Sequence, residues 1–321
     1  MRIIILGATG FLGGQIARAA HELGHEVHGL RRNPASFGAV GDLPVEWHQG
    51  DLNDPASLID ALRGSEVVYH AAAYYPYRDH HPARAVAQAK AEIQSVLQSA
   101  RAAGVRRLVY ASSLTTIGAL PTGENRLADE RDPYIPGSTG NAYFEAKWIM
   151  EREVLEANGH DLETLALIPT AIFGPGDIKP TTGEILLELA RGRMPVGVDI
   201  VTNFVDGRDV ALACLRAAEM GQPGQRYLIG GHNMSATDML REAAQAAGVK
   251  LPRWALSRRA TLRLFGLAAA LRLPIPELMR GIAHFQPLEC SRGWQTFSFQ
   301  PRPFAETARD TIDWFRQNGY V

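Results

Sequence analysis

Tyr143 and Lys147 are the residues most suited to acid–base chemistry, because they lie four positions apart in a stretch with helical periodicity. That spacing places both side chains on one face of a helix. An ammonium group beside a phenol lowers the phenol pKa from about 10, so the tyrosine can exchange a proton with a carbonyl or alcohol oxygen near neutral pH. Ser113 follows an expected strand and could donate a hydrogen bond to the same substrate oxygen.

A glycine-rich segment at 7–13 gives this pair a context, because the Tyr-x-x-x-Lys spacing alone also occurs by chance on solvent-facing helices. The segment joins an apolar run to a helical pattern. Gly7 permits a tight turn, Gly10 leaves room for a pyrophosphate, and Gly13 lets the helix pack closely on the sheet. Free N–H groups at the helix start then bind the phosphates. The pattern predicts a dinucleotide-binding turn, with an ordinary glycine turn as the alternative.

The residues after the second expected strand indicate which dinucleotide binds. An NAD site places Asp or Glu there, about 20 residues past the glycines. This sequence has Arg31 and Arg32 instead, and guanidinium groups suit the 2′-phosphate of NADP(H). The alternative is a solvated surface pair, which leaves NAD open. Asp51, after the third expected strand, could accept a hydrogen bond from the adenine amino group beside the Leu52 N–H, or could be only a helix-capping or turn residue.

Regular elements must position these residues. Short apolar runs alternate with amphipathic patterns in the first half, which is typical of a parallel sheet covered on both faces. The expected strands are 2–6, 27–30, 45–48, 67–70, 108–112 and 164–168, and the expected helices are 11–23, 55–62, 83–103 and 142–157. We therefore expect an α/β fold with a doubly wound parallel sheet of the Rossmann type.

The pattern changes after Pro169, where prolines and glycines predict a loop-rich stretch to about residue 202. A helix at 209–220 and a strand at 225–229 follow, and the chain from 235 onward shows helical patterns and no long strand. We expect residues 1–170 plus 203–231 to form the NAD(P)-binding domain. Residues 171–202 plus 232–321 would form a smaller, mostly helical substrate-binding domain.

The composition argues against several classes of protein. The 321 residues contain 33 Lys and Arg against 34 Asp and Glu, whereas a general nucleic-acid binder needs a basic surplus. Cys214 and Cys290 provide neither a disulfide framework nor a metal-ligand spacing, and His80-His81 lacks a third ligand, so no metal is expected. The apolar run at 264–271 is too short to span a membrane. We expect a cytoplasmic protein.

Together the motifs resemble the extended short-chain dehydrogenase/reductases of the NAD-dependent epimerase/dehydratase type. The matching segments, in the order of the family, are 7–13, 50–52, 70–73, 108–113, 143–147, 169–176 and 208–210. The resemblance implies that Ser113, Tyr143 and Lys147 form the catalytic trio. The cofactor contacts inferred from the motifs and the resemblance are Gly7, Thr9, Gly10, Phe11, Leu12, Gly13, Arg31, Arg32, Asp51, Leu52, Ala71, Ala72, Ala73, Ser112, Lys147, Pro169, Thr170 and Ile172.

Within this family the sequence is most similar to the dihydroflavonol-reductase and carbonyl-reductase-like branch. Residues 32–34 resemble the basic phosphate reader of that branch, and 168–170 resemble its segment near the nicotinamide. Sugar-nucleotide epimerases usually carry an acid after the second strand, and an Asn where this chain has Ile168. One departure concerns the helix at 83–103, which in the family presents an Asn that supports a water and proton relay. Here that position is Ala89.

Three segments, 74–77, 114–140 and 173–194, should surround the substrate. The substrate contacts we expect are Tyr74, Tyr75, Thr115 and Phe173. The tyrosines could form an aromatic wall for an apolar or aromatic small molecule, or they could only pack against the second domain.

The main functional hypothesis is an NADP(H)-dependent oxidoreductase that interconverts a carbonyl and an alcohol. The first alternative is a nucleotide-sugar epimerase or dehydratase with tightly bound NAD. The second is a redox sensor that binds a dinucleotide without catalysis, although such proteins commonly lose the Tyr143 and Lys147 pair. As the family often does, the chain could form a homodimer through the helices at 83–103 and 142–157.

Overall fold

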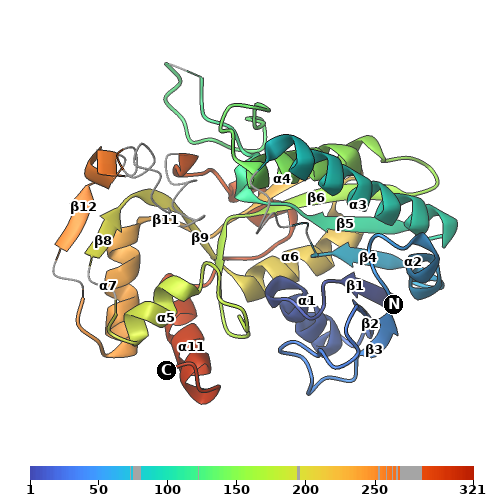
Figure 1. Cartoon of the computed structure of the whole chain (residues 1–321), viewed down its shortest axis with the longest axis horizontal. Coiled ribbons are helices and arrows are strands. Elements are labelled where there is room, and N and C mark those ends of the chain that lie inside the picture. The colour runs from blue at the N-terminus through green and yellow to red at the C-terminus, as the bar shows by residue number, and fades with distance from the viewer. Residues whose placement is uncertain are drawn as a thin grey trace.

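The computed structural model describes residues 1–72, 74, 81–121, 123–193, 196–251, 254–257, 259–261, 263, 264, 267 and 284–321. Its centre is a sheet of seven strands in the order β10-β6-β5-β4-β1-β2-β3, in which every neighbouring pair is parallel (Figure 1). The strands are β1 (Arg2–Leu6), β2 (Glu26–Arg31), β3 (Glu46–Gln49), β4 (Val67–His70), β5 (Arg107–Ala111), β6 (Glu163–Pro169) and β10 (Arg226–Ile229).

Helices cover both faces of this sheet. They are α1 (Phe11–Glu22), α2 (Pro55–Leu62), α3 (Pro82–Ala102), α4 (Ala142–Glu156) and α6 (Gly207–Met220). Ile3 and Ile5 of β1 pack in a cluster with α1 and α6, whereas Ile4 and Leu6 pack with α2, α3 and α4. Figure 1 shows α3 and α4 on one side of the sheet and α1 and α6 on the other. The doubly wound parallel sheet expected from the sequence is confirmed.

The strand order changes direction at β1. The chain passes from β1 to β2 and β3 on one side, and then continues through β4, β5 and β6 on the other. In open α/β sheets this switch point leaves a crevice at the carboxyl ends of the strands, where ligands bind. The glycine-rich turn, the loop after His70 and Ser113 all follow strands at this edge.

A second group of elements lies at one end of the molecule, on the left in Figure 1. It contains β7 (Ala171–Phe173), α5 (Glu184–Ala190), β8 (Val196–Asp199), β9 (Val201–Asp206), β11 (His232–Ser235), α7 (Ala236–Ala247), β12 (Trp254–Ser257) and α11 (Phe304–Gln317). The strands form one sheet in the order β11-β9-β7 and a β12-β8 pair. Its core includes Phe173, Leu186, Phe204, Met239 and Ile312.

The prediction of a loop-rich stretch from 170 to 202 holds for residues 174–183 and is wrong for the rest. This stretch contains β7, α5 and β8. Proline and glycine break the local pattern, but Leu186, Leu187 and Leu189 of α5 are buried, so tertiary packing stabilises a helix that local signals conceal.

The end of the chain returns to the large sheet through α10 (Ser291–Thr296). Phe297 and Phe299 are buried in the cluster that contains Ile3 and Ile5, and the Phe297 ring lies 5.0 Å from that of Tyr227 on β10. The division into two domains along the expected boundaries therefore stays a prediction, because residues from the expected substrate domain pack on the sheet.

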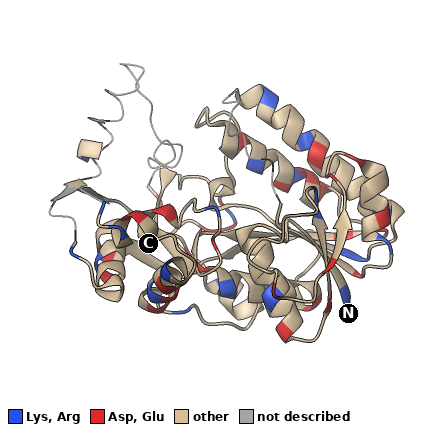
Figure 2. Cartoon of the chain, turned by 60° about the horizontal axis from the view of Figure 1, so that its bottom comes forward, with Lys and Arg blue, Asp and Glu red and all other residues tan. Residues whose placement is uncertain are grey.

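Basic and acidic side chains are interspersed over the helices in the view of Figure 2. Of the helices described, none combines the length and the apolar character needed to cross a bilayer.

Candidate active site

Ser113 and Tyr143 come together where β5 ends and α4 begins. Asn141 caps α4 by accepting hydrogen bonds from the backbone N–H groups of Tyr143 at 2.9 Å and Phe144 at 3.5 Å. Ser113 caps a 3₁₀ turn over Leu114–Thr116 that follows β5. The Tyr143 hydroxyl group donates to the Ser113 hydroxyl oxygen at 3.4 Å. The two hydroxyl groups expected to share a substrate oxygen are therefore neighbours.

Lys147 lies one turn after Tyr143 on α4 and is 5% exposed. Its ammonium group donates to the carbonyl oxygens of Ala111 at 3.2 Å and Ser112 at 3.5 Å, and to the hydroxyl group of Tyr110 at 3.4 Å. Burial lowers the pKa of Lys147 to about 8, although nearby carboxylates oppose the shift. The ammonium group is thus charged at neutral pH and titrates just above it, in the same site as the two hydroxyl groups.

Glu151, which the sequence analysis did not identify, lies one turn beyond Lys147. Its carboxylate accepts hydrogen bonds from the hydroxyl groups of Ser112 and, at 2.7 Å, Thr116, and it pairs with Arg226 at 2.7 Å. These contacts join α4 to the end of β5 and to β10. In the sequence this residue resembles an ordinary charged position on a helix, so only the fold identifies its role.

The glycine-rich turn has the shape that a pyrophosphate requires. Gly7 has a φ of +95°, and a Cβ at this position would lie 2.6 Å from the backbone nitrogen of Ala72. A Cβ on Gly13 would lie 2.1 Å from the carbonyl oxygen of Gly7. Gly10 is exposed and begins α1 without a side-chain cap, so no side chain occupies the N–H groups of the first turn. The turn therefore fits the phosphates of a dinucleotide.

The other three residues of this segment that we expect to contact the cofactor are Thr9, Phe11 and Leu12. An added Cβ at Gly207 or Gly174 would lie only 3.1 or 3.4 Å from the Phe11 ring, so the ring fills a notch between two glycines. Leu12 packs partly buried against the core, and Thr9 is partly buried.

The loop after β4 lies against the same turn. Ala71 and Ala72 both donate backbone hydrogen bonds to the carbonyl oxygen of Leu6, at 2.9 and 2.8 Å. This arrangement brings the expected cofactor loop beside the glycine-rich turn. Ala73 lies outside the described residues.

Arg31 and Arg32 differ in their surroundings at the end of β2. The Arg31 guanidinium group lies 4.5 Å from the centre of the Phe37 ring and 5.0 Å from that of Trp47, so two aromatic side chains hold it. The Arg32 side chain is 81% exposed, with Asp51 at 4.0 Å. Of the two groups, Arg32 is the more accessible to a phosphate.

Asp51 and Leu52 follow β3. The backbone N–H of Asn53 donates to Asp51 at 2.9 Å, which lowers the pKa of the Asp51 carboxyl group. The Asp51 side chain is 41% exposed and accessible to an adenine amino group. Leu52 packs partly buried against the cluster of α2, α3 and α4.

The residues after β6 connect the two groups of elements. The Thr170 backbone N–H donates to Ile229 at 3.1 Å and its hydroxyl group donates to Asn203 at 2.9 Å. Ile172 packs partly buried against the core of the large sheet. Pro169 is the last residue of β6, at the carboxyl edge where the cofactor is expected.

Of the expected substrate contacts, Thr115 lies beside Ser113, and Tyr74 packs against a core cluster of the large sheet. Thr115 is buried and donates its backbone N–H to the Ser113 hydroxyl oxygen at 3.3 Å. Tyr74 packs partly buried against the cluster of α2, α3 and α4. Tyr75 lies outside the described residues.

Phe173 does not have the exposure expected of a substrate contact. It is 0% exposed, and its ring lies 5.7 Å from the ring of Phe204 and 5.5 Å from that of Phe304. The three rings form part of the core of the second group of elements, so the assignment of Phe173 to the substrate pocket is corrected. The position after β7 resembled a pocket segment, but long-range packing buries it.

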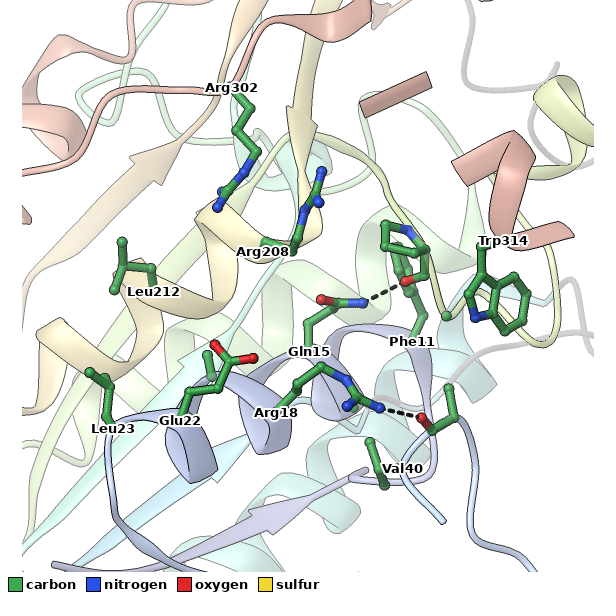
Figure 3. A pocket seen from close by; sticks show the side chains of 15 residues that line it. Phe11, Gln15, Arg18, Glu22, Leu23, Val40, Arg208, Leu212, Arg302 and Trp314 are labelled. Atoms are coloured by element: carbon green, nitrogen blue, oxygen red, sulfur yellow. Dashed lines mark hydrogen bonds between the residues drawn. The ribbon is translucent and has the colours of Figure 1, made fainter. Parts of the chain in front are cut away.

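A separate cavity of about 530 Å³ lies along α1, α6 and α11 (Figure 3). Gln15 donates to the carbonyl oxygen of Pro175 at 2.5 Å across its wall. Its arginines Arg18, Arg208 and Arg302 each pair with an aspartate. Ser113, Tyr143 and Lys147 do not line this cavity.

Among the described residues, one group of side chains lies close enough together to share a metal ion, namely His28, Glu46 and His48. His28 is already hydrogen-bonded through one ring nitrogen to His48 and through the other to Glu26, both at 2.8 Å. This chain of hydrogen bonds accounts for the buried imidazole without a metal. His80 lies outside the described residues.

Comparison with known proteins agrees with this geometry. The family model for the NAD-dependent epimerase/dehydratase family matches residues 3–230. A Synechocystis protein provisionally named dihydroflavonol 4-reductase is 30% identical over 99% of this chain and 95% of its own length. Sterol demethylase protein B of Methylococcus capsulatus is also 30% identical, over the full length of both chains.

Solved structures show the same fold over the whole chain. The structure of gox2253 has a TM-score of 0.84 and 31% identity, and covers 100% of this chain and 99% of its own. A nucleoside-diphosphate-sugar epimerase from Pseudomonas aeruginosa has the same TM-score with 27% identity and the same coverage. The chain therefore belongs to the NAD-dependent epimerase/dehydratase family of the extended short-chain dehydrogenases/reductases.

Proposed function

We propose that this chain is an NADP(H)-dependent oxidoreductase that interconverts a carbonyl group and an alcohol, with Tyr143 as the general acid and base. The observation that carries the proposal is the 3.4 Å hydrogen bond between the Tyr143 and Ser113 hydroxyl groups, beside the buried ammonium of Lys147. A substrate oxygen placed between the two hydroxyl groups would meet two donors at once.

The cofactor, when bound, supplies or accepts the hydride at the substrate carbon. Ser113 holds the substrate oxygen and stabilises the charge that develops on it. Tyr143 gives its phenolic proton to that oxygen during reduction, and takes a proton from the alcohol during oxidation. Lys147 would hold the nicotinamide ribose through its hydroxyl groups, and its positive charge would stabilise the phenolate of Tyr143.

The preference for NADP(H) rests on Arg32. Its guanidinium group is 81% exposed, and no carboxylate stands at the end of β2 where an NAD site would have one. Arg31, held against Phe37 and Trp47, adds positive charge to the same edge.

An apolar or aromatic substrate is supported by the expected substrate loop. Residues of 117–138, together with Phe144 and residues 284–286, line a pocket of about 330 Å³ that contains mostly apolar side chains. The names of the relatives agree with this class, because they include a sterol demethylase protein and a 2-alkyl-3-oxoalkanoate reductase.

The test is a panel of ketones and aldehydes incubated with NADPH, with loss of reduced cofactor followed by absorbance. We expect turnover on apolar carbonyl compounds, and a loss of about a hundredfold or more in Tyr143→Phe. Tyr320→Phe is the matched control, because the Tyr320 hydroxyl group donates to Ile178 outside the trio. Absence of turnover on every compound in the panel would reject the proposal.

A nucleotide-sugar epimerase is the second candidate, favoured by the 27% identity to the Pseudomonas aeruginosa structure. Such an enzyme returns the hydride to its substrate and retains its cofactor. Mass spectrometry of the protein purified without added cofactor distinguishes the two. Tightly bound NAD would favour the epimerase, whereas exchangeable NADP(H) favours the reductase.

A further inference from the structure

Glu151 continues the row of side chains that Tyr143 and Lys147 begin on α4. The three residues are spaced four apart, so they share one face of the helix. The proposed chemistry uses the first two and gives no part to the third. Glu151 is nevertheless 3% exposed, and a carboxylate is costly to bury unless donors satisfy both of its oxygens.

Three donors surround the Glu151 carboxylate. Its Oε2 atom accepts hydrogen bonds from the hydroxyl groups of Ser112 and, at 2.7 Å, Thr116, while its Oε1 atom lies 2.7 Å from Nη1 of Arg226. A glutamine amide could not replace the carboxylate, because its NH₂ group would have to face either Arg226 or the two hydroxyl groups. The arrangement therefore requires a carboxylate.

These partners enclose the 3₁₀ turn that begins at Ser113. Ser112 precedes that residue, and Thr116 ends the turn. Both the backbone N–H and the hydroxyl oxygen of Thr116 lie 2.9 Å from the Ser113 carbonyl oxygen. Arg226 holds the turn from β10, because its Nη2 atom donates to the Thr116 carbonyl oxygen at 2.9 Å. Glu151 and Arg226 thus bind the turn at both ends.

The position of this turn decides where the Ser113 hydroxyl group lies. Its oxygen accepts from the Thr115 backbone N–H at 3.3 Å and from the Tyr143 hydroxyl group at 3.4 Å. The two hydroxyl groups belong to different elements, the turn after β5 and the helix α4, so their separation depends on what joins these elements. Glu151 supplies such a junction directly, from the same face of α4 as Tyr143.

We propose that the Glu151–Arg226 pair is a clamp that positions the Ser113 hydroxyl group against Tyr143. Both members of the clamp are positioning residues that act through Ser113. Without the clamp the turn shifts relative to α4, and a substrate oxygen no longer meets both hydroxyl groups at once. A misplacement of about 1 Å in an active site can cost about a hundredfold in rate. This inference rests on the proposed function and deepens it.

A second route from Glu151 to the chemistry must be separated from the clamp. Two carboxylates, Glu151 and Glu92 of α3, oppose the lowering of the Lys147 pKa by burial. Removing the charge of Glu151 therefore also makes Lys147 easier to deprotonate. An effect that passes through Lys147 does not need Ser113, whereas the effect of the clamp does.

The first test needs neither cofactor nor substrate. Hydrogen exchange, followed by mass spectrometry, compares the backbone amides of the turn at 113–117 with those of β5. In Glu151→Gln the turn should exchange at least about tenfold faster relative to β5, because the turn is released while the strand stays in the sheet. A variant that is only less stable overall would speed both segments by the same factor.

The second test is a double-mutant cycle on the turnover of an active carbonyl compound with NADPH. Glu151→Gln alone should lower kcat about tenfold, with KM and NADPH affinity unchanged. Ser113→Ala should lower kcat about a hundredfold, because one donor to the substrate oxygen is lost. In the Ser113→Ala background, Glu151→Gln should cost about twofold or less, since the residue that it positions is gone. Arg226→Lys should repeat the pattern, because a lysine cannot hold both Glu151 and the turn.

Glu153→Gln is the matched control, because Glu153 also lies on α4 and pairs with Lys90 and Gln94 away from the turn. It should change neither measurement. If Glu151→Gln does not fold, Thr116→Val carries both tests, since it removes one hydrogen bond and leaves the ion pair of Glu151 in place.

Two results would overturn the clamp. One is a turn that exchanges no faster than β5 in Glu151→Gln. The other is a tenfold loss from Glu151→Gln that persists in Ser113→Ala, which would assign the effect to Lys147 or to general destabilisation. Failure of the proposed function is distinguishable, because the wild type would then turn over no carbonyl compound. The exchange measurement would still decide whether Glu151 holds the turn.

Discussion

Replacing Arg32 by alanine should remove most of the preference for NADPH over NADH. The guanidinium group is 81% exposed and its nearest carboxylate, Asp51, lies 4.0 Å away, so a 2′-phosphate meets little competition. A hydrogen bond between charged groups contributes about 1.5–3 kcal/mol, and solvent screening at an exposed side chain favours the lower value. Because about 1.4 kcal/mol corresponds to tenfold in affinity, NADPH should bind about tenfold more weakly.

The assay is calorimetric titration of the wild type and variants with NADPH and NADH. Arg63→Ala is the matched control, because Arg63 is 70% exposed and pairs with Asp60 at 3.4 Å at the end of α2. We expect the NADH affinity to stay unchanged in Arg32→Ala, and the wild-type preference to narrow as salt is added. The reasoning fails if the wild type shows no preference, or if Arg32→Ala weakens both cofactors equally.

Three further predictions follow from the site. Gly13→Ala should abolish cofactor binding, because its Cβ would lie 2.1 Å from a backbone oxygen. Gly14→Ala should bind normally in the same titration, since its Cβ would make only ordinary contacts, with the Val40 side chain at 3.4 Å and the Ala8 carbonyl oxygen at 3.7 Å. Cofactor affinity should fall as the pH rises through about 8, because the Lys147 ammonium is present below its lowered pKa and lost above it. A Lys147→Met variant that keeps this pH dependence would contradict the role of Lys147 in cofactor binding. Urea unfolding should show that Glu151→Gln lowers the free energy of unfolding by about 3 kcal/mol, because it leaves the partly buried Arg226 without its ion-pair partner. Glu156→Gln is the control at an exposed ion pair and should change the free energy of unfolding by about 0.5 kcal/mol or less.

The sequence predicted the large sheet well because its central strands, such as β1, β4 and β5, are buried. Such strands appear as continuous apolar runs, as at Ile3–Leu6. Ser113 follows the end of β5 and Tyr143 lies at the start of α4, so local signals were enough to single out these positions, whereas their catalytic roles stay a prediction. The structure places the hydroxyl groups of Tyr143 and Ser113 in contact, and the Lys147 ammonium group on the carbonyl oxygen of Ala111 at the end of β5.

The missed features depend on contacts between distant parts of the chain. Glu92 and Glu151 have the local pattern of solvent-facing helix positions, and only the packing of α3 against α4 and β5 shows that they are buried. Arg31 is held by Trp47 from the neighbouring strand, which no local signal reveals. Phe173 failed as a substrate contact because Phe304, far along the chain, covers it.

Deuterium transfer tests the central claim most directly. NADPH carrying deuterium on its transferable position is incubated with the wild type and with Tyr143→Phe in the presence of the carbonyl panel, and the products are analysed by mass spectrometry. The account predicts an alcohol with one deuterium on its carbinol carbon from the wild type, and almost none from Tyr143→Phe at equal cofactor binding. An alcohol formed without deuterium, or formed equally fast by Tyr143→Phe, would contradict it.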